Sequence, residues 1–314
     1  MRTGRRATTV SMAALATALG LAGLTGLASA PATAVTLTDA STPSALTGMW
    51  AWGNPIDPAT DARGTGDAAF DPAALAAFAS AHRLQTVYLS VPWAADQGEF
   101  ATWLPAAVSA LHGAGVTTVA ALGGDPAWAT QPELAATWTR TALATAPFDA
   151  IQFDVEPWVG ATDDQLPGIV AQLGTMYDTA AQAAGGVPVG ADLPWWLQAK
   201  AQPGGSGTLF QTLLPHLDSV AIVAFSDHAD GDDGIVALAR PAAAAASAAG
   251  LPFSVGVETD SPQVAGGAGA TFGDDTAAVL EAQTAIVRSE LSGLTGYRGV
   301  TVEHLLSWQA LLAR

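Results

Sequence analysis

The sequence predicts one domain with an α/β fold, a (β/α)8 TIM barrel with a shortened last helix. Eight short apolar runs recur along the chain, with starts roughly 30 to 45 residues apart, as in repeated strand and helix units. Each interval holds an amphipathic stretch of helical period. A doubly wound open sheet is the alternative. That fold normally has a glycine-rich phosphate-binding turn after its first strand, and the turn from Trp52 to Pro55 lacks this pattern. The expected strands are 47–52, 85–91, 117–122, 150–155, 187–193, 219–225, 253–257 and 299–303.

The N-terminal segment has the pattern of an export signal. Residues 1–34 combine arginines at positions 2, 5 and 6, an apolar stretch over 12–27, and small residues at Ala32 and Ala34 before a cleavage point. Both the general secretory route and the twin-arginine route fit this pattern. We therefore expect a secreted, extracellular protein that loses residues 1–34.

The rest of the chain divides into a short lead-in and one folded domain. Residues 35–46 are rich in Thr, Ser and Pro and are expected to be disordered, and the barrel occupies residues 47–314. The chain has only residues 309–314 after Trp308, so the last helix must be short. No stretch after residue 34 reaches the roughly 18 consecutive apolar residues of a membrane span, so the exported protein is not expected to enter a membrane.

Charge and composition exclude several kinds of partner. Loss of residues 1–34 removes three of the 11 basic residues and none of the 28 acidic ones, which takes the formal net charge from −17 to −20. Such a charge repels nucleic acid and anionic membranes. The chain has no cysteine, so a secreted form depends on its core for stability. We expect a monomer that needs no cofactor.

Aromatic and acidic side chains gather after the expected strands, where a barrel of this type forms its active site. Any one tryptophan there could equally pack between the helices and the barrel. As a group, indole rings beside carboxylates suit a carbohydrate, whose C–H faces stack on rings and whose hydroxyl groups bond to acids. The expected substrate-binding residues are Trp50, Trp52, Trp93, Trp128, Trp158, Asp192, Trp195, Asp227, His304 and Trp308.

Asp154 and Glu156 are the expected centre of the site. Alternate residues of a strand point the same way, so both carboxyl groups are expected to face the mouth of the barrel. When two carboxyl groups lie so near each other, they do not both ionise readily. One therefore keeps its proton near neutral pH, as a general acid for glycosidic cleavage must. Glu258 is the expected partner, as nucleophile, base or substrate ligand. A separation of about 5 Å between Glu156 and Glu258 would indicate a retaining reaction, and a wider one inversion.

The segment from Phe148 to Glu156 resembles the signature of chitinase-type (family 18) glycoside hydrolases, F-D-G-x-D-x-D-x-E, in which the strand ends in the catalytic acid. The resemblance implies that Glu156 is the general acid and that Asp154 positions an acetamido group of the substrate. Gln152 stands where the motif has an inner acid, and Phe225 where the sixth strand of that family has a tyrosine. The strand ends together are also similar to bacterial barrel proteins described as glycoside-hydrolase-like.

Three functions are consistent with these residues. The first is a secreted glycoside hydrolase that acts on a polysaccharide or glycoconjugate by carboxylate general acid catalysis. The second is a non-catalytic carbohydrate-binding barrel, which the departures at Gln152 and Phe225 favour. The third is a metal-dependent hydrolase that uses Asp227, His228, Glu258 and His304. No His-x-His or His-x-x-x-His spacing supports a metal site, so none is expected.

Overall fold

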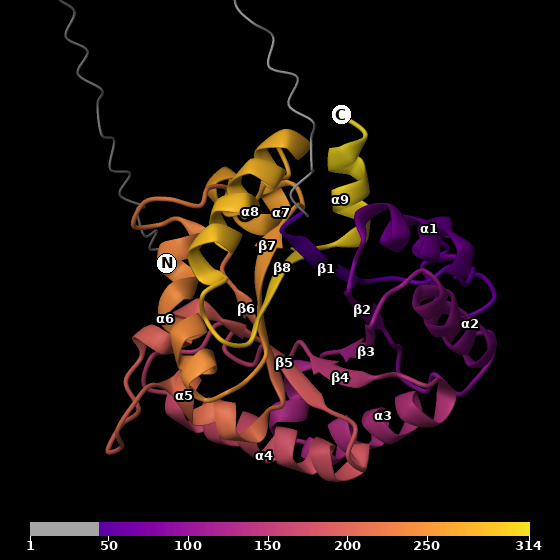
Figure 1. The fold of residues 1–314 in the computed structure, drawn as a ribbon. Coiled ribbons are helices and arrows are strands. Elements are labelled where there is room, and N and C mark those ends of the chain that lie inside the picture. Colours follow the sequence, from indigo (N-terminus) through magenta and orange to yellow (C-terminus); the bar gives the residue numbers. More distant parts are fainter. Residues whose placement is uncertain (1–43) are drawn as a thin grey trace, which may run out of the picture. The chain divides into compact units, whose positions relative to one another are not determined.

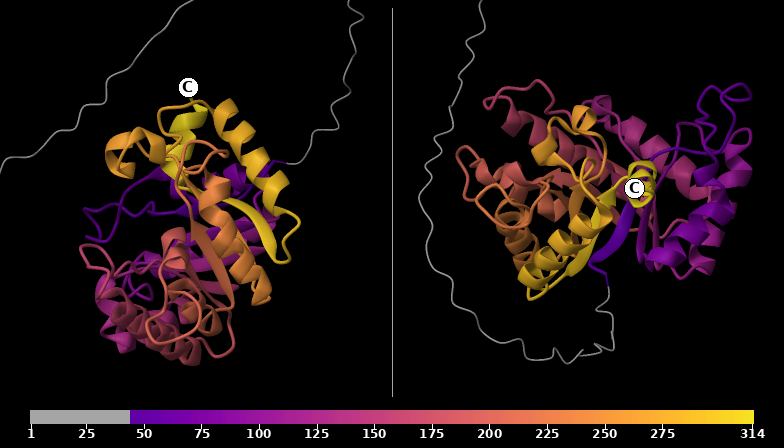
Figure 2. Two further views of the ribbon diagram at one scale, coloured as in Figure 1. Left: turned by 90° about the vertical axis from the view of Figure 1, so that its left-hand side faces the viewer. Right: turned by 90° about the horizontal axis from the view of Figure 1, so that it is seen from above.

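The computed structural model describes residues 44–314, whose eight strands close into a parallel barrel (Figures 1 and 2). Each strand pairs with its neighbours in the chain, and β8 pairs with β1 to complete the ring. The predicted (β/α)8 fold is confirmed, and each expected strand overlaps an observed one. The strands are β1 (Leu46–Ala51), β2 (Thr86–Ser90), β3 (Thr118–Gly123), β4 (Ala150–Phe153), β5 (Val189–Pro194), β6 (Ser219–Val223), β7 (Phe253–Glu258) and β8 (Tyr297–Glu303).

Helices cover the outside of the barrel, where they pack on the outward-facing side chains of the strands to form the main core. The last helix, α9, has eight residues, so the shortened last helix is confirmed. The helix α7 is a single turn within the segment that joins β7 to α8. The helices are α1 (Pro72–His82), α2 (Phe100–Gly113), α3 (Pro132–Thr145), α4 (Leu166–Ala184), α5 (Leu209–Leu213), α6 (Ile235–Ala248), α7 (Pro262–Ala265), α8 (Ala277–Leu291) and α9 (Leu305–Leu312).

The start of the barrel differs slightly from the expected boundary. The expected export signal and most of the expected lead-in fall within residues 1–43, outside the described part of the chain. β1 begins at Leu46, and both Ala45 and Leu46 are only 2% exposed, so these two residues belong to the folded domain. Within residues 44–314, no helix combines the length and the apolar character that a bilayer crossing requires.

Side chains that point inward fill the barrel in three levels along its axis. Where the strands begin, small side chains such as Ser219 and Thr301 leave a cavity of about 430 Å³. In the middle level, the rings of Trp50 and Tyr88 pack with centroids 5.4 Å apart. Carboxyl groups occupy the third level, at the ends of the strands. The middle level therefore separates the cavity from the mouth of the barrel.

Gly124 allows β3 and β4 to approach closely at the mouth. A Cβ atom on Gly124 would lie 1.7 Å from the backbone oxygen of Asp154, which no side chain can tolerate. The backbone N–H of Asp154 in turn donates to the oxygen of Gly123 at 3.1 Å, which extends the ladder past the end of β4. The absence of a side chain at Gly124 therefore allows the backbone that carries Asp154 to lie in this position.

Replacement of Gly124 by Ala should destabilise the protein. The added methyl group would push β4 away from β3, and we expect a loss of roughly 1–3 kcal/mol in the free energy of unfolding. Gly113, at the end of α2, is the matched control, because a Cβ atom there meets nothing within 4 Å. Gly113→Ala should leave stability unchanged or raise it by up to about 1 kcal/mol. Equal stabilities of the two variants in urea unfolding would contradict the close approach.

Candidate active site

Four carboxyl groups from four strands meet at the mouth of the barrel. Asp154 follows β4, Asp192 lies in β5, Glu258 ends β7 and Glu303 ends β8. Their side chains point into the barrel, because the residues that alternate with them, such as Val302, point outward and are fully buried under the helices. The charge of Asp154 raises the pKa of both Asp192 and Glu303, which indicates that the groups are close neighbours. These four residues are called the carboxyl layer below.

Asp192 is the most enclosed member of the carboxyl layer, at 3% exposed. The indole Nε1 of Trp50 donates to its Oδ2 at 3.0 Å, and the amide Nε2 of Gln152 donates to its Oδ1 at 2.7 Å. Burial raises the pKa of Asp192 well above its usual range, the charge of Asp154 adds to the rise, and the two hydrogen bonds oppose it. Gln152 thus supplies a donor at a place where a further acid would add repulsion.

Asp154 and Glu156 interact electrostatically but lie in different environments. Burial raises the pKa of Asp154 to about 7, and the negative charge of Glu156 adds to the rise. Glu156 lies beyond the end of β4, its side chain is exposed, and it forms no side-chain hydrogen bond within residues 44–314. The partly buried Asp154 therefore holds a proton near neutral pH, while Glu156 extends into solvent.

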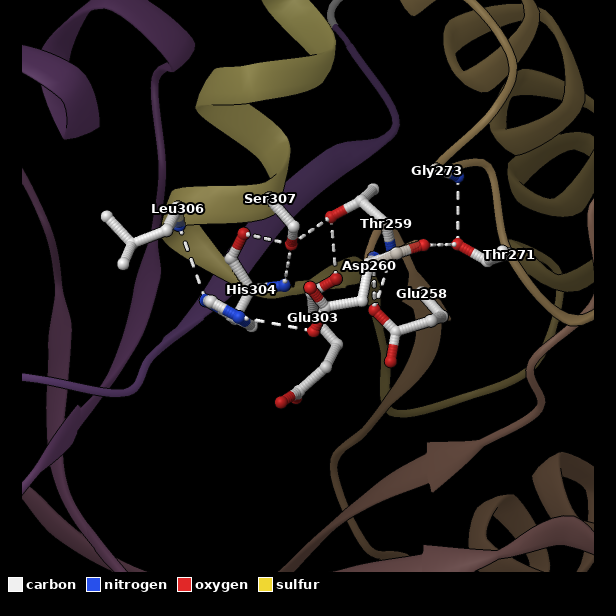
Figure 3. A network of polar contacts seen from close by, with 9 residues as sticks. All are labelled: Glu258, Thr259, Asp260, Thr271, Gly273, Glu303, His304, Leu306 and Ser307. Atoms are coloured by element: carbon white, nitrogen blue, oxygen red, sulfur yellow. Dashed lines mark hydrogen bonds and ion pairs between the residues drawn. The ribbon is translucent and has the colours of Figure 1, made fainter. Parts of the chain in front are cut away.

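Glu258 is fixed at one oxygen and free at the other. Its carboxyl group is largely buried, and Oε1 accepts the backbone N–H groups of Thr259 and Asp260, each at 2.7 Å (Figure 3). The second oxygen points away from these donors, and no described residue bonds to it. Burial raises the pKa of Glu258 to about 7, while the two N–H bonds lower it. A carboxyl group held in this way can direct one oxygen at a bound molecule.

Glu303 is a member of the site that the sequence analysis did not select. It pairs in register with Glu258 on the neighbouring strand, so both side chains face the same interior space (Figure 3). Burial raises its pKa well above the usual range, the charges of Asp154, Glu258 and Asp192 add to the rise, and a hydrogen bond from Trp52 opposes it. The strand phase of β8 could have identified it, because Glu303 follows the inward-facing Thr301 by two residues.

His304 stands behind the carboxyl layer rather than inside it. Its Nδ1 accepts the backbone N–H of Leu306 and so caps α9, and its Nε2 lies 3.3 Å from Oδ2 of Asp260 (Figure 3). Burial lowers the pKa of His304, and the neighbouring carboxylate of Asp260 opposes this. The Thr259 hydroxyl also bonds to the Ser307 hydroxyl at 2.8 Å. These contacts tie the end of β7 to the start of α9 and hold Glu258 and Glu303 side by side.

Two of the tryptophans expected to contact a sugar are enclosed instead. Trp308 is 1% exposed and packs against Phe78 and His82, with ring centroids 5.1 and 4.8 Å away. Trp50 is also 1% exposed and belongs to the middle level of the barrel. The predictions that Trp50 and Trp308 bind substrate are therefore wrong, because neither ring offers a face to solvent.

Three other tryptophans line one cavity at the mouth. Trp52, Trp93 and Trp128 follow β1, β2 and β3 and, with Asp125, border a space of about 490 Å³, which is in the size range of small-molecule sites. Trp93 is 47% exposed, whereas Trp128 is 6% exposed and rests on Trp138. Trp52 also bonds to Glu303, so it joins this cavity to the carboxyl layer. We call this cavity the tryptophan pocket.

The remaining expected contacts lie on the other side of the mouth. Trp158 is 9% exposed and packs edge-on against Trp196 at 5.8 Å, while Trp195 is partly exposed. Asp227 is partly exposed and bonds to Nδ1 of His228 at 2.5 Å. These residues belong to the segments that follow β4, β5 and β6.

The geometry gives little support to a metal site. His228 pairs with Asp227 and Asp233, whereas His304 pairs with Asp260. Across residues 44–314, no three His, Asp or Glu side chains are arranged so that they could hold a metal ion together. The four residues of the metal-dependent hypothesis therefore do not form one ligand set.

Comparison with known proteins identifies the fold. No protein-family model and no curated protein sequence matches this chain. A family 18 (GH18) chitinase from Pseudoalteromonas aurantia matches 83% of this chain and 94% of its own, with a TM-score of 0.55 at 11% identity. A GH18 chitinase from Cycas revoluta matches 68% of each chain (TM-score 0.40, 14% identity), and a HpcH/HpaI aldolase/citrate lyase family protein from Burkholderia cenocepacia matches 86% of this chain and 92% of its own (0.39, 16%). The protein therefore has a TIM barrel distantly similar to that of family 18 chitinases.

The raised pKa of Glu258 should make stability depend on pH. The folded state keeps the Glu258 proton up to about pH 7, whereas the unfolded chain releases it near its ordinary value, so folding is increasingly opposed as pH rises between these values. Glu258→Gln keeps an oxygen acceptor for the N–H groups of Thr259 and Asp260 and removes the ionisation. We expect its Tm to exceed the wild-type value by about 2–4 °C at high pH and to match it at low pH, where both states are protonated. Calorimetry at both pH values measures this.

The matched control is Glu290→Gln, on the exposed face of α8, where Glu290 pairs with Arg240. That variant should show no such gain in Tm at high pH. A Tm difference between Glu258→Gln and the wild type that stays constant with pH would contradict the assigned protonation of Glu258.

Proposed function

We propose that the protein is a secreted glycoside hydrolase that acts on a polysaccharide or glycoconjugate by carboxyl acid catalysis. The observation that carries this proposal is the carboxyl layer at the barrel mouth, in which Glu258 is held at one oxygen and free at the other, and burial raises the pKa values of Asp154 and Glu258 to about 7. Such groups can give up and accept protons near neutral pH. The adjacent tryptophan pocket offers ring faces to a sugar. The export pattern of residues 1–34 supports secretion.

Glu156 is the proposed proton donor to the glycosidic oxygen, because it stands where the chitinase-type motif has its catalytic acid and its side chain is exposed at the mouth. Asp154 keeps this donor effective. After Glu156 has given a proton to the leaving group, its negative charge lies beside Asp154, whose pKa burial and that charge raise to about 7, so two adjacent negative charges are disfavoured.

Glu258 is the proposed nucleophile or base. In its ionised form, the oxygen that accepts no N–H bond can attack the anomeric carbon or remove a proton from water. Glu303, in register beside it, retains its proton and can donate a hydrogen bond to a sugar hydroxyl group or to the ionised Glu258. In this proposal Glu258 takes part in the reaction, and Glu303 positions the substrate or Glu258.

A non-catalytic carbohydrate-binding barrel is the second candidate. Gln152 favours it, because this neutral amide bonds to Asp192 where the chitinase-type motif has an inner acid. Phe225 favours it as well, because the phenyl ring has no hydroxyl group to hold an acetamido group. In that case the tryptophan pocket would still bind sugar, and no glycosidic bond would break.

Glu156→Gln should separate the two candidates. If Glu156 donates the proton, its amide replacement should lower the hydrolysis rate by roughly 10²–10⁴-fold and leave sugar binding within about twofold. New reducing ends released from a panel of polysaccharides measure the rate, and Glu290→Gln serves as a fully active control. Equal rates for Glu156→Gln and the wild type would refute the role of Glu156. Binding by the wild type without any hydrolysis would favour the non-catalytic barrel.

The corrected roles of the tryptophans predict opposite effects for two alanine variants. Trp93→Ala should weaken sugar binding by about tenfold, a loss of stacking, and leave Tm unchanged because the ring is half exposed. Trp308→Ala should lower the free energy of unfolding by about 3–5 kcal/mol and leave binding by the folded protein intact. Calorimetric unfolding and titration of both variants measure these effects. A binding defect confined to Trp308→Ala would contradict the assignment.

A further inference from the structure

The acidic residues of the described chain gather on one face of the barrel. In the segments that follow the strands, residues 154–164 contain four carboxyl groups and residues 227–233 contain four more. Many of them face solvent, such as Asp163 and Asp233, whose side chains are 76% and 87% exposed. The mouth of the barrel is therefore surrounded by negative charge.

Positive charge at the mouth is scarce and already paired. Within these segments the basic residues are Arg63, which bonds to Asp61, Lys200, which bonds to Asp163, and the histidines His228 and His304, which pair with Asp227, Asp233 and Asp260. Arg314, at the end of α9, approaches the same face and donates to the backbone oxygen of Gly273. These basic residues therefore have protein partners and leave most of the surrounding carboxylates uncompensated.

The opposite face of the barrel is different. In the segments that precede the strands, Asp149 and Asp218 accept the backbone N–H groups of Val119 and Val189, and each has a structural role there. Arg83 lies in the same set of segments and Arg298 lies at the start of β8, so charges of both signs occur on this face. The excess of acid is thus a property of the mouth and not of the whole surface.

Within the mouth, two further features point to a ligand. Glu258 is 6% exposed and directs an oxygen without a partner into the mouth (Figure 3). Asp125 lies on the rim of the tryptophan pocket with an exposed side chain whose Oδ1 caps the following turn through the N–H of Ala127. The aromatic faces of the tryptophan pocket thus adjoin the carboxylate of Asp125, which lacks a cationic partner among the described residues.

We propose that the ligand of this mouth is a positively charged carbohydrate, an amino-sugar polymer whose amino groups are free and protonated. Sugar rings would lie on Trp52 and Trp93, ammonium groups would approach Asp125, and the exposed carboxylates around the mouth, such as Asp163 and Asp233, would attract them. A polyanionic polysaccharide would be repelled by the same charges. This proposal rests on the proposed function and specifies its substrate class.

Titration with a matched pair of sugars tests the proposal. The probes are a glucosamine hexamer and its fully N-acetylated counterpart, which share one backbone and differ in charge, at mildly acidic pH where the amines are protonated. We expect the glucosamine hexamer to bind at least about tenfold more tightly at low salt, and the preference to disappear in about 1 M salt, where the Debye length is about 3 Å. Equal or tighter binding of the N-acetylated hexamer, or no binding of the glucosamine hexamer, would overturn the proposal.

Asp125→Asn tests the role of charge at the tryptophan pocket. Asparagine caps a turn as well as aspartate does, so the fold is kept while one negative charge is lost. We expect about threefold weaker binding of the glucosamine hexamer and no change for the N-acetylated hexamer, whereas Glu290→Gln, remote on α8, should change neither. No effect of Asp125→Asn on either sugar would count against the assigned contact.

Failure of this proposal differs from failure of the proposed function. Cleavage of an uncharged polysaccharide that depends on Glu156 would uphold the hydrolase and reject the charged substrate. Tight, salt-sensitive binding of the glucosamine hexamer without cleavage of any polymer would uphold the charged ligand and reject the hydrolase.

Discussion

Closure of the barrel removes four carboxyl groups from water at a single level, and the rest of the site follows from that constraint. A desolvated carboxylate needs donors or must keep its proton. Asp192 has donors from Trp50 and Gln152, and Glu258 has two backbone N–H groups. Even with this help, burial raises the pKa of every member of the carboxyl layer. The layer therefore stores protons at a pH where surface carboxyl groups have lost them.

The same constraint explains how the mouth can be both stable and reactive. Protonation of these buried carboxyl groups limits their mutual repulsion, while Asp154 and Glu258, whose pKa values are raised to about 7, remain able to exchange protons near neutral pH. Behind the layer, the contacts of Asp260, His304 and Ser307 fix the strand ends. Trp52, which lines the tryptophan pocket, bonds to Glu303 and so connects an apolar surface to the carboxyl layer.

The barrel could be predicted from the sequence because the short apolar runs of the strands and the helical period of the segments between them are local properties of the chain. Strand phase also predicted that Asp154 and Glu258 face the mouth. It did not separate the exposed Glu156 from the partly buried Asp154, because the point at which a strand ladder ends depends on the neighbouring strand. Trp308 was assigned to the rim for a similar reason: its burial depends on the packing of α9 against α1, which involves residues far apart in the chain. Strand phase could place Glu303 at the mouth, two residues after the inward-facing Thr301, but its position beside Glu258 depends on the register between β7 and β8, which no single segment contains.

The most direct test of this account is a pH titration of the side-chain carboxyl carbons by ¹³C NMR. Asp192→Asn and Glu303→Gln assign two of the signals by their disappearance, and Glu258→Gln assigns a third. The account predicts that the Asp192 and Glu303 signals titrate well above the ordinary range for carboxyl groups, and that of Glu258 at about 7. Titration of all three signals near the ordinary value of roughly 4 would contradict it, because the mouth would then hold no protons for chemistry at neutral pH.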